Sequence, residues 1–468
     1  MPLSDLKSKY SKKDLKFGPS IEKVKQEMSV YYETRRHEPN NNFLYGFLCL
    51  IYDGANTLEA IKSKMRLFFI STTRIPVIEN EDVEEFLQIA RRKKLVIINE
   101  DDKISLTNEG KNLVELSYHQ ILHTSHWMRI LFSEKTVMIV TAFCLIILSI
   151  LKIFTGLQLT SQGMLTEGFE NLTDLIKIGI IAVIGFKFNK DRLASIIIIL
   201  MVLFTGATMV WASIEALFNP TPIIPTIQAY IIGFVSIAMN AGLMYLKSIV
   251  GRSSGNLSLL SDSKDSELNV RLSIGVLIGL TFAILKYYFV DAIVGLVIAA
   301  LIFVEGIKIL RELVAKEEDF DITAIKVVAD NIYNTRLTGY LLGNIRRKRI
   351  TRSQVLKNFE QGLTLGRLYY EGFADFFYDE LGPEIAEKHL DKLIEGKSIE
   401  ILKEDLVITP KGMKILYKSK AKEYNSRANL IITGKKFNKH HLYWLIFVII
   451  FILLIIFGND INSWLTSL

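Results

Sequence analysis

The chain has 468 residues, of which 50% are hydrophobic and 22% charged, with a formal net charge of +7. Its mean hydropathy is positive, so charged residues must be segregated from long apolar runs, as in membrane proteins. Two cysteines exclude a disulfide framework. The sequence has neither a Walker-type phosphate loop nor a set of residues suited to nucleophilic catalysis, which argues against an ATP-driven pump and against an enzyme.

Residues 1–128 are predicted to form a cytoplasmic, soluble domain. The start is polar and lysine-rich, without the apolar core of a signal peptide. Helical apolar spacing over 41–70 is followed by an amphipathic helix from Glu81, strands at 95–98 and 104–106, and a helix capped by Thr107. This order resembles a winged-helix domain, with the acidic turn 99–102 as the tip of the wing.

Apolar runs of bilayer length dominate the next part of the chain. They lie at about 136–156, 163–185, 193–217, 224–249, 273–285 and 290–307, and a further run lies at 442–457. We therefore expect a six-helix membrane domain over residues 129–316 and a seventh membrane helix within 437–468.

Basic residues are confined to alternate connections between these runs. The connections near 155–161 and 219–226 contain no lysine or arginine, whereas those on the other side contain several: Lys187, Lys190, Arg192, Lys247, Arg252 and Lys264. By the positive-inside rule, the amino terminus and both soluble domains face the cytoplasm and the carboxyl terminus lies outside the cell membrane.

Residues 317–436 are predicted to form a second soluble domain that repeats the first. The segments SIEIL, LVIT and PKGMKIL follow one another around a charged turn, in the order strand, strand, helix. A basic run precedes them: Arg346, Arg347, Lys348, Arg349 and Arg352. Such a run binds DNA phosphates or, in the interpretation we prefer, forms a solvated helix face beside anionic lipid.

Three acids open the second apolar run. Glu170 and Asp174 are four residues apart, so they share one helix face, and Glu167 lies one turn before them. Carboxylates in a membrane segment are costly unless they face a cavity or a partner, which indicates a functional site.

A second copy of this pattern occupies residues 256–280. At a constant offset, Asp262 matches Glu167, Asp265 matches Glu170 and Asn269 matches Asp174. Two helices would then present four oxygen side chains to one point, a set that suits a hard divalent cation. The predicted ligands are Glu170, Asp174, Asp265 and Asn269.

The spacing of these motifs on a second and a fifth membrane helix resembles the cation diffusion facilitator family of divalent-metal/proton antiporters. The likeness covers about residues 135–313. It implies an all-α polytopic membrane protein with a six-helix core, here joined by a seventh, carboxyl-terminal helix and two small α+β winged-helix-like domains. It also implies efflux of a divalent cation in exchange for protons, and a homodimer in the lipid bilayer.

Two ligand positions depart from the family pattern, because Glu170 stands where a histidine or aspartate is usual and Asn269 replaces the final aspartate. A site without imidazole favours manganese, iron(II) or magnesium over zinc. The family's usual metal-sensing domain after the sixth helix is not recognisable, and the winged-helix-like domain stands in its place.

Alternatives remain for the neighbouring residues. Lys177 and Arg271 would neutralise the carboxylates and leave a charge cluster without metal, in a core that no longer transports. Glu167 and Asp262 suit a second shell or an entrance charge. Asp291, at the start of the sixth run, suits a gate or a helix-dipole partner.

Three histidines, His119, His123 and His126, precede the first membrane run on one helix face. They suit a peripheral transition-metal site or, with Trp127, interfacial anchors. The rival to transport is a membrane-tethered regulator whose winged-helix-like domains bind DNA or protein; nucleic acid is the less favoured partner.

Overall fold

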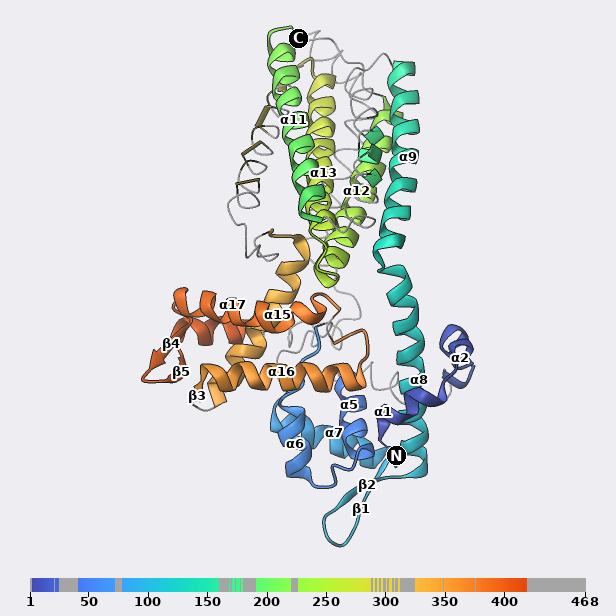
Figure 1. The fold of residues 1–468 in the computed structure, drawn as a ribbon, viewed down its shortest axis with the longest axis vertical. Helices are drawn as coiled ribbons and strands as arrows, with labels where there is room; N and C mark the ends of the chain where they lie inside the picture. The colour runs from blue at the N-terminus through green and yellow to red at the C-terminus, as the bar shows by residue number, and fades with distance from the viewer. Residues whose placement is uncertain are drawn as a thin grey trace. The chain divides into compact units, whose positions relative to one another are not determined.

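The computed structural model describes residues 2–20, 22–24, 41–71, 78–159, 191–219, 226–287, 325–347, 349–374 and 376–418, with short stretches inside 168–179 and 289–311. The chain divides into two compact units. The first, which we call the α+β unit, joins residues 1–131 to residues 330–436; the second, the membrane unit, comprises 132–329 and 437–468. The two soluble segments predicted from the sequence thus share one unit (Figure 1).

The amino-terminal half of the α+β unit follows the predicted order. It contains α1 (Leu3–Leu6), η1 (Lys7–Lys9), α2 (Lys12–Phe17), α5 (Asn41–Tyr52), α6 (Leu58–Met65), α7 (Asn80–Arg92), β1 (Val96–Ile98), β2 (Ile104–Leu106) and α8 (Asn108–Leu131). The strands pair antiparallel, with Val96 opposite Leu106. The expected helix, both strands and the helix after Thr107 are confirmed, while the winged-helix assignment stays a prediction.

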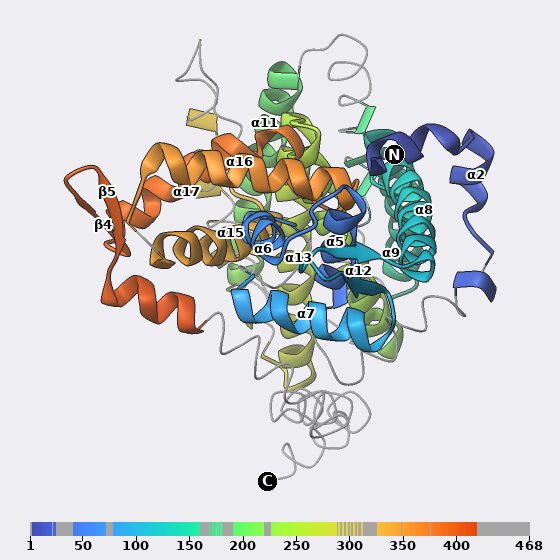
Figure 2. The ribbon, with the colours of Figure 1, turned by 90° about the horizontal axis from the view of Figure 1, so that it is seen from below.

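The carboxyl-terminal half repeats that order with one additional strand. It contains α15 (Val328–Arg347), β3 (Ile350–Thr351), α16 (Arg352–Tyr369), η4 (Asp379–Leu381), α17 (Gly382–Glu395), β4 (Ile399–Leu402), β5 (Asp405–Ile408) and a helix over 410–418. The sheet is antiparallel in the order β3-β5-β4, and the β4–β5 hairpin projects at one edge (Figure 2). Strand β3 has only two residues, too few for a sequence pattern to predict.

The same threonine hydrogen bonds join the hairpin to the following helix in both halves. Thr107 caps α8 by accepting from the Gly110 N–H at 3.0 Å, and its hydroxyl donates to the Lys94 carbonyl oxygen at 2.8 Å. Thr409 accepts from the Gly412 N–H at 3.1 Å and donates to the Lys397 carbonyl oxygen at 2.9 Å.

The two lysines share a second property, a positive φ of 53° and 54° respectively. A Cβ at Gly110 or Gly412 would overlap the carbonyl oxygen of Leu95 or Ser398, the residue that precedes the first strand of the hairpin. The two halves therefore have the same local structure at this hairpin, as the likeness of their sequences predicts.

Helix α16 joins the two halves of the α+β unit. The Phe69 N–H donates to the Gly362 carbonyl oxygen at 3.3 Å, and the Ser71 N–H donates to the Ala374 carbonyl oxygen at 2.7 Å. Glycine at 362 is required because a Cβ there would overlap the Leu67 carbonyl oxygen. The segment 67–71 can thus lie directly against the helix.

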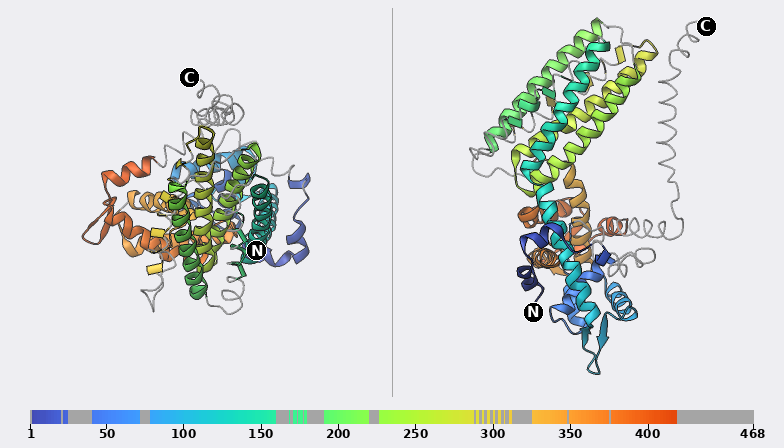
Figure 3. Two further views of the ribbon diagram at one scale, coloured as in Figure 1. Left: turned by 90° about the horizontal axis from the view of Figure 1, so that it is seen from above. Right: turned by 90° about the vertical axis from the view of Figure 1, so that its right-hand side faces the viewer.

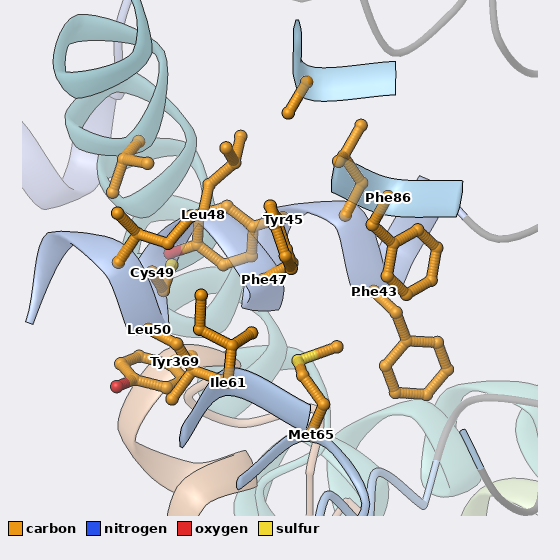
Figure 4. Close-up of a cluster of buried hydrophobic side chains, with 14 of the residues drawn as sticks. Phe43, Tyr45, Phe47, Leu48, Cys49, Leu50, Ile61, Met65, Phe86 and Tyr369 are labelled. Carbon is orange, nitrogen blue, oxygen red and sulfur yellow. The ribbon is translucent and has the colours of Figure 1, made fainter. Parts of the chain in front are cut away.

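Aromatic residues at the end of α16 complete the amino-terminal core. Tyr369 packs among the buried side chains of α5 and α6, next to Leu50 and Ile61 (Figure 4). Its hydroxyl donates to Asp53 Oδ2 at 2.7 Å, while the Gly46 N–H donates to the Tyr370 hydroxyl at 2.9 Å. Because these contacts are buried, the amino-terminal half has no complete core without the end of α16.

The membrane unit consists of long apolar helices that run side by side (Figure 3). Described in full are α9 (Glu134–Leu159), α11 (Asp191–Phe218), α12 (Ile227–Ser253) and α13 (Leu257–Ile284). Within the described ranges, three helices are long and apolar enough to cross a membrane: Glu134–Thr155, Ile227–Ser253 and Leu257–Ile284. The protein is a multi-pass membrane protein, and the expected runs at 163–185, 290–307 and 442–457 lie wholly or largely outside the described residues.

One membrane helix is longer than its apolar run. The sequence predicts the fifth run at 273–285, but α13 begins at Leu257, because the Asn256 side chain caps it by accepting from the Leu259 N–H at 3.0 Å. The additional turns carry the polar residues of the second motif and bury them.

Replacing Gly362 by alanine tests the contact between the two halves. We expect a loss of about 1–3 kcal/mol of stability, because the segment 67–71 must move away from α16. Thermal unfolding of the purified full-length chain measures the change. The control is Gly242→Ala in α12, where an added Cβ meets nothing within 4 Å; equal unfolding midpoints for the two variants would contradict the assignment.

His389 of α17 makes the stability of this unit depend on pH. Its Nε2 lies 2.7 Å from Thr338 Oγ1, and burial, reinforced by Lys392, lowers the pKa of the imidazole to about 4. The neutral ring stabilises the fold fully above the unfolded pKa of about 6.5, and this contribution is lost as the pH falls toward 4. About 2 kcal/mol is lost between pH 7 and pH 5, at 1.36 kcal/mol per pKa unit.

The prediction is that wild-type protein loses more stability than His389→Gln when the pH is lowered from 7 to 5. Chemical unfolding of the full-length chain at both pH values provides the comparison. Equal losses for the two proteins would show that His389 is not the responsible group.

Candidate metal centre

Residues 257–273 of α13 carry a dense set of buried polar side chains. All of the following are less than a tenth exposed: Ser258, Ser261, Asp262, Ser263, Asp265, Ser266, Asn269 and Ser273. Polar groups withdrawn from water cost free energy unless they find partners, so their partners define what the site can do.

The two predicted motifs meet at their last positions. Asn269 Nδ2 of α13 donates to Asp174 Oδ2, 95 residues earlier in the chain, at 2.9 Å. Both side chains are buried, and so is Asp265, one helical turn before Asn269. Three of the four predicted ligands are thus described, and a buried hydrogen bond links two of them across the two motifs.

A buried ion pair joins the same part of α13 to α12. Lys247 Nζ of α12 contacts Asp262 Oδ2 at 2.7 Å and donates to Ser266 Oγ at 2.8 Å, and the side chains of Lys247 and Asp262 are both 4% exposed. The loop charges predict Lys247 to be in a cytoplasmic connection, and the sequence does not indicate this partner. The helical spacing of Ser236, Asn240 and Lys247 puts them on one face of α12, and this spacing is the signal in the sequence that indicates a buried position for Lys247.

Further buried cations accompany Lys247 in the membrane unit. Lys152 of α9 and Arg252 of α12 are 3% and 1% exposed, and the Arg252 guanidinium donates to the Ile325 carbonyl oxygen at 2.6 Å. Buried acids and buried bases therefore occur together in this unit, which lowers the electrostatic cost of placing carboxylates there.

The remaining predicted residues fall into two groups. Arg271 pairs with Glu267, one turn earlier on α13, and Lys264 contacts the same carboxylate at 2.9 Å. Glu167, Glu170, Lys177 and Asp291 lie outside the described residues. In the part of the chain that the structure describes, no three His, Cys, Asp or Glu side chains gather as a metal site. The four-ligand set, which includes Glu170, therefore stays a prediction.

The histidines before the first membrane helix contact the end of helix α2. His119 Nε2 lies 3.2 Å from the Asp14 carbonyl oxygen, and His123 Nδ1 lies 2.8 Å from that of Leu15. The Trp127 indole N–H donates to the Lys16 carbonyl oxygen at 3.1 Å. The Asp14 carbonyl oxygen also accepts from the Gly18 N–H at 2.8 Å. Carbonyls in the last turn of a helix lack the usual intrahelical donors, so this face of α8 caps the end of α2. His126 packs edge-on against Trp127, and metal binding by these rings stays a prediction.

The basic run of the second soluble segment is engaged within the α+β unit. Arg347 donates to Glu79 Oε2 at 2.8 Å, and Arg346 lies 3.7 Å from the same carboxylate. Arg352 contacts Asp391 at 2.6 Å and Glu387 at 3.0 Å, and its hydrogen bond to Asp391 raises the pKa of the guanidinium. These acids compensate the charges of Arg346, Arg347 and Arg352, three of the five basic residues predicted to face solvent, lipid or phosphate.

Lys247→Met tests the buried ion pair. It leaves Asp262 buried without this cation, and breaking a buried pair from one side typically costs about 3–5 kcal/mol. The double variant Lys247→Met/Asp262→Asn should recover much of the loss, as judged by thermal unfolding and by the monodisperse fraction in size-exclusion chromatography. A single variant as stable as the wild type would contradict the role of the pair.

Residues 138–316 match the family model described as the cation efflux transmembrane domain. The matched range includes α11, α12 and α13 and therefore the contacts of Asp174, Lys247, Asp262 and Asn269 described above. A comparison with curated proteins finds no match.

Proposed function

The chain belongs to the cation diffusion facilitator family through residues 138–316, and on that premise we propose that it exports a divalent metal cation across the membrane in exchange for protons. Metal-cation transport in general follows from the cation efflux domain. The observation that carries the more specific proposal is the 2.9 Å hydrogen bond between Asn269 and Asp174, because it connects the two acidic motifs inside the bundle.

The proposed cargo site uses oxygen atoms alone. Asp174 and Asp265 supply carboxylates, Asn269 supplies an amide oxygen, and Glu170 is the fourth proposed ligand. Oxygen ligands without imidazole or thiolate suit manganese, iron(II) or magnesium better than zinc.

Proton exchange follows from the chemistry of the same atoms. A carboxylate oxygen binds either a proton or the metal, so protons arriving from the far side displace the cation. Asn269 does not titrate, which limits the exchangeable protons of the proposed set to three. Helices carrying the two motifs would open the site alternately to each side of the membrane.

The distribution of charge in the α+β unit disfavours the regulatory alternative. Helix α7 and the β1–β2 turn carry acids that would repel DNA phosphates: Glu81, Asp82, Glu84, Glu85, Glu100, Asp101 and Asp102. Arg347 and Arg352, two of the arginines that would bind phosphate, are paired with acids instead. We propose that the unit is cytoplasmic and part of the transporter, and, by family membership, that the protein forms a homodimer.

Substituting the two described carboxylates tests the transport proposal. Asp174→Asn or Asp265→Asn should reduce Mn²⁺ uptake into proteoliposomes, driven by a pH gradient, to the rate of protein-free vesicles. The control is Glu267→Gln, which removes an acid of the same helix that pairs with Lys264 and Arg271. Wild-type flux in both aspartate variants would overturn the proposal.

A further inference from the structure

We propose that Asn240 of α12 provides a further oxygen ligand to the transported cation, so that a third helix contributes to the site. This inference rests on the proposed function, because it assumes a cation between the two acidic motifs. It adds a residue that neither motif contains.

The side-chain amide of Asn240 donates hydrogen bonds but accepts none among the described residues. Its Nδ2 donates to the Ser236 carbonyl oxygen at 3.0 Å and to Ser236 Oγ at 3.3 Å, which fixes the orientation of the side chain. The residue is 1% exposed, and its Oδ1 has no hydrogen-bond partner among the residues that the structure describes. A buried carbonyl oxygen left in this way is costly, and such atoms call for a ligand or another explanation.

The register of α12 against α13 places this residue beside the site. Ser236 Oγ lies 3.2 Å from Ser273 Oγ, and about three turns further along α12 the ion pair joins Lys247 to Asp262. These contacts run antiparallel, with Gly233 against Leu277 at the opposite end. Position 240 of α12 is therefore level with position 269 of α13, where Asn269 donates to Asp174.

The chemistry of an amide oxygen fits this place. It is a hard, neutral ligand, so it adds to the coordination number of a divalent cation without adding charge to be compensated. Manganese and magnesium take about six oxygen ligands, whereas zinc is usually satisfied by four. We therefore expect Asn240 to increase the preference for six-coordinate ions over zinc.

Variants at two neighbouring positions separate a ligand from a structural residue. Asn240→Ala removes the oxygen, and Asn240→Asp retains an oxygen while removing the donor to Ser236. Ser236→Ala removes one acceptor of the Asn240 amide but leaves the main-chain acceptor in place, so it is the matched control on the same buried face.

The test measures Mn²⁺ binding to the purified full-length protein from the electron paramagnetic resonance signal of free Mn²⁺, after size-exclusion chromatography has confirmed folding. Asn240→Ala should weaken Mn²⁺ binding at least about tenfold, the scale on which supporting residues of a metal site act. Asn240→Asp and Ser236→Ala should retain the wild-type dissociation constant within about threefold. Zn²⁺ binding, measured by competition, should fall less than Mn²⁺ binding in Asn240→Ala.

Wild-type affinity in Asn240→Ala, or an equal loss in Ser236→Ala, would overturn the inference. Binding that depends on Asn240 without any flux would support the inference and overturn transport. If flux is lost in Asp174→Asn while Asn240→Ala binds Mn²⁺ as the wild type does, transport is supported and the inference is overturned. A wild-type protein that binds no Mn²⁺ would overturn both.

Discussion

Charge buried inside an apolar helix bundle is the constraint on which the membrane unit depends. An isolated carboxylate in such a place would lose its hydration, so each acid needs a cation, a hydrogen-bond donor or a proton. Lys247 meets this need for Asp262, and the Asn269 amide meets it in part for Asp174. A divalent cation meets the same need more strongly, because its charge is double and several oxygens share it. The partners that lower the free-energy cost of burying these carboxylates thus also make the carboxylates suitable for exchanging ions.

The α+β unit is assembled from the two sides of the membrane domain in the sequence. Its amino-terminal core is completed by Tyr369 and Tyr370, which are synthesised more than 300 residues after the α5 side chains they contact. Close approach at Gly362 and Gly366 of α16 makes this contact possible. The unit is therefore complete only after residues 132–329 have been synthesised. Its folding thus follows the synthesis of the membrane unit.

Local patterns in the sequence predict several features of the fold. They do not predict contacts between residues that are distant in the sequence. Strand alternation and the threonine cap predicted β1, β2 and the start of α8, and the constant offset between the motifs brought Asp174 to Asn269. The loop charges predict Lys247 in a connection, because nothing local in the sequence indicates its partner on another helix. The spacing of His119 and His123 correctly predicted one shared face, but nothing local indicated that their partners are main-chain carbonyls of α2. The segment that lies against α16 depends on glycines almost 300 residues away.

The most direct test of the account is the anomalous scattering of crystals of the full-length protein grown with Mn²⁺, measured at the manganese absorption edge. The account predicts a peak within coordination distance, about 2.0–2.6 Å, of carboxylate oxygens of Asp174 and Asp265. A peak only at the histidines of α8, or no peak between the two acidic motifs at saturating Mn²⁺, would contradict it.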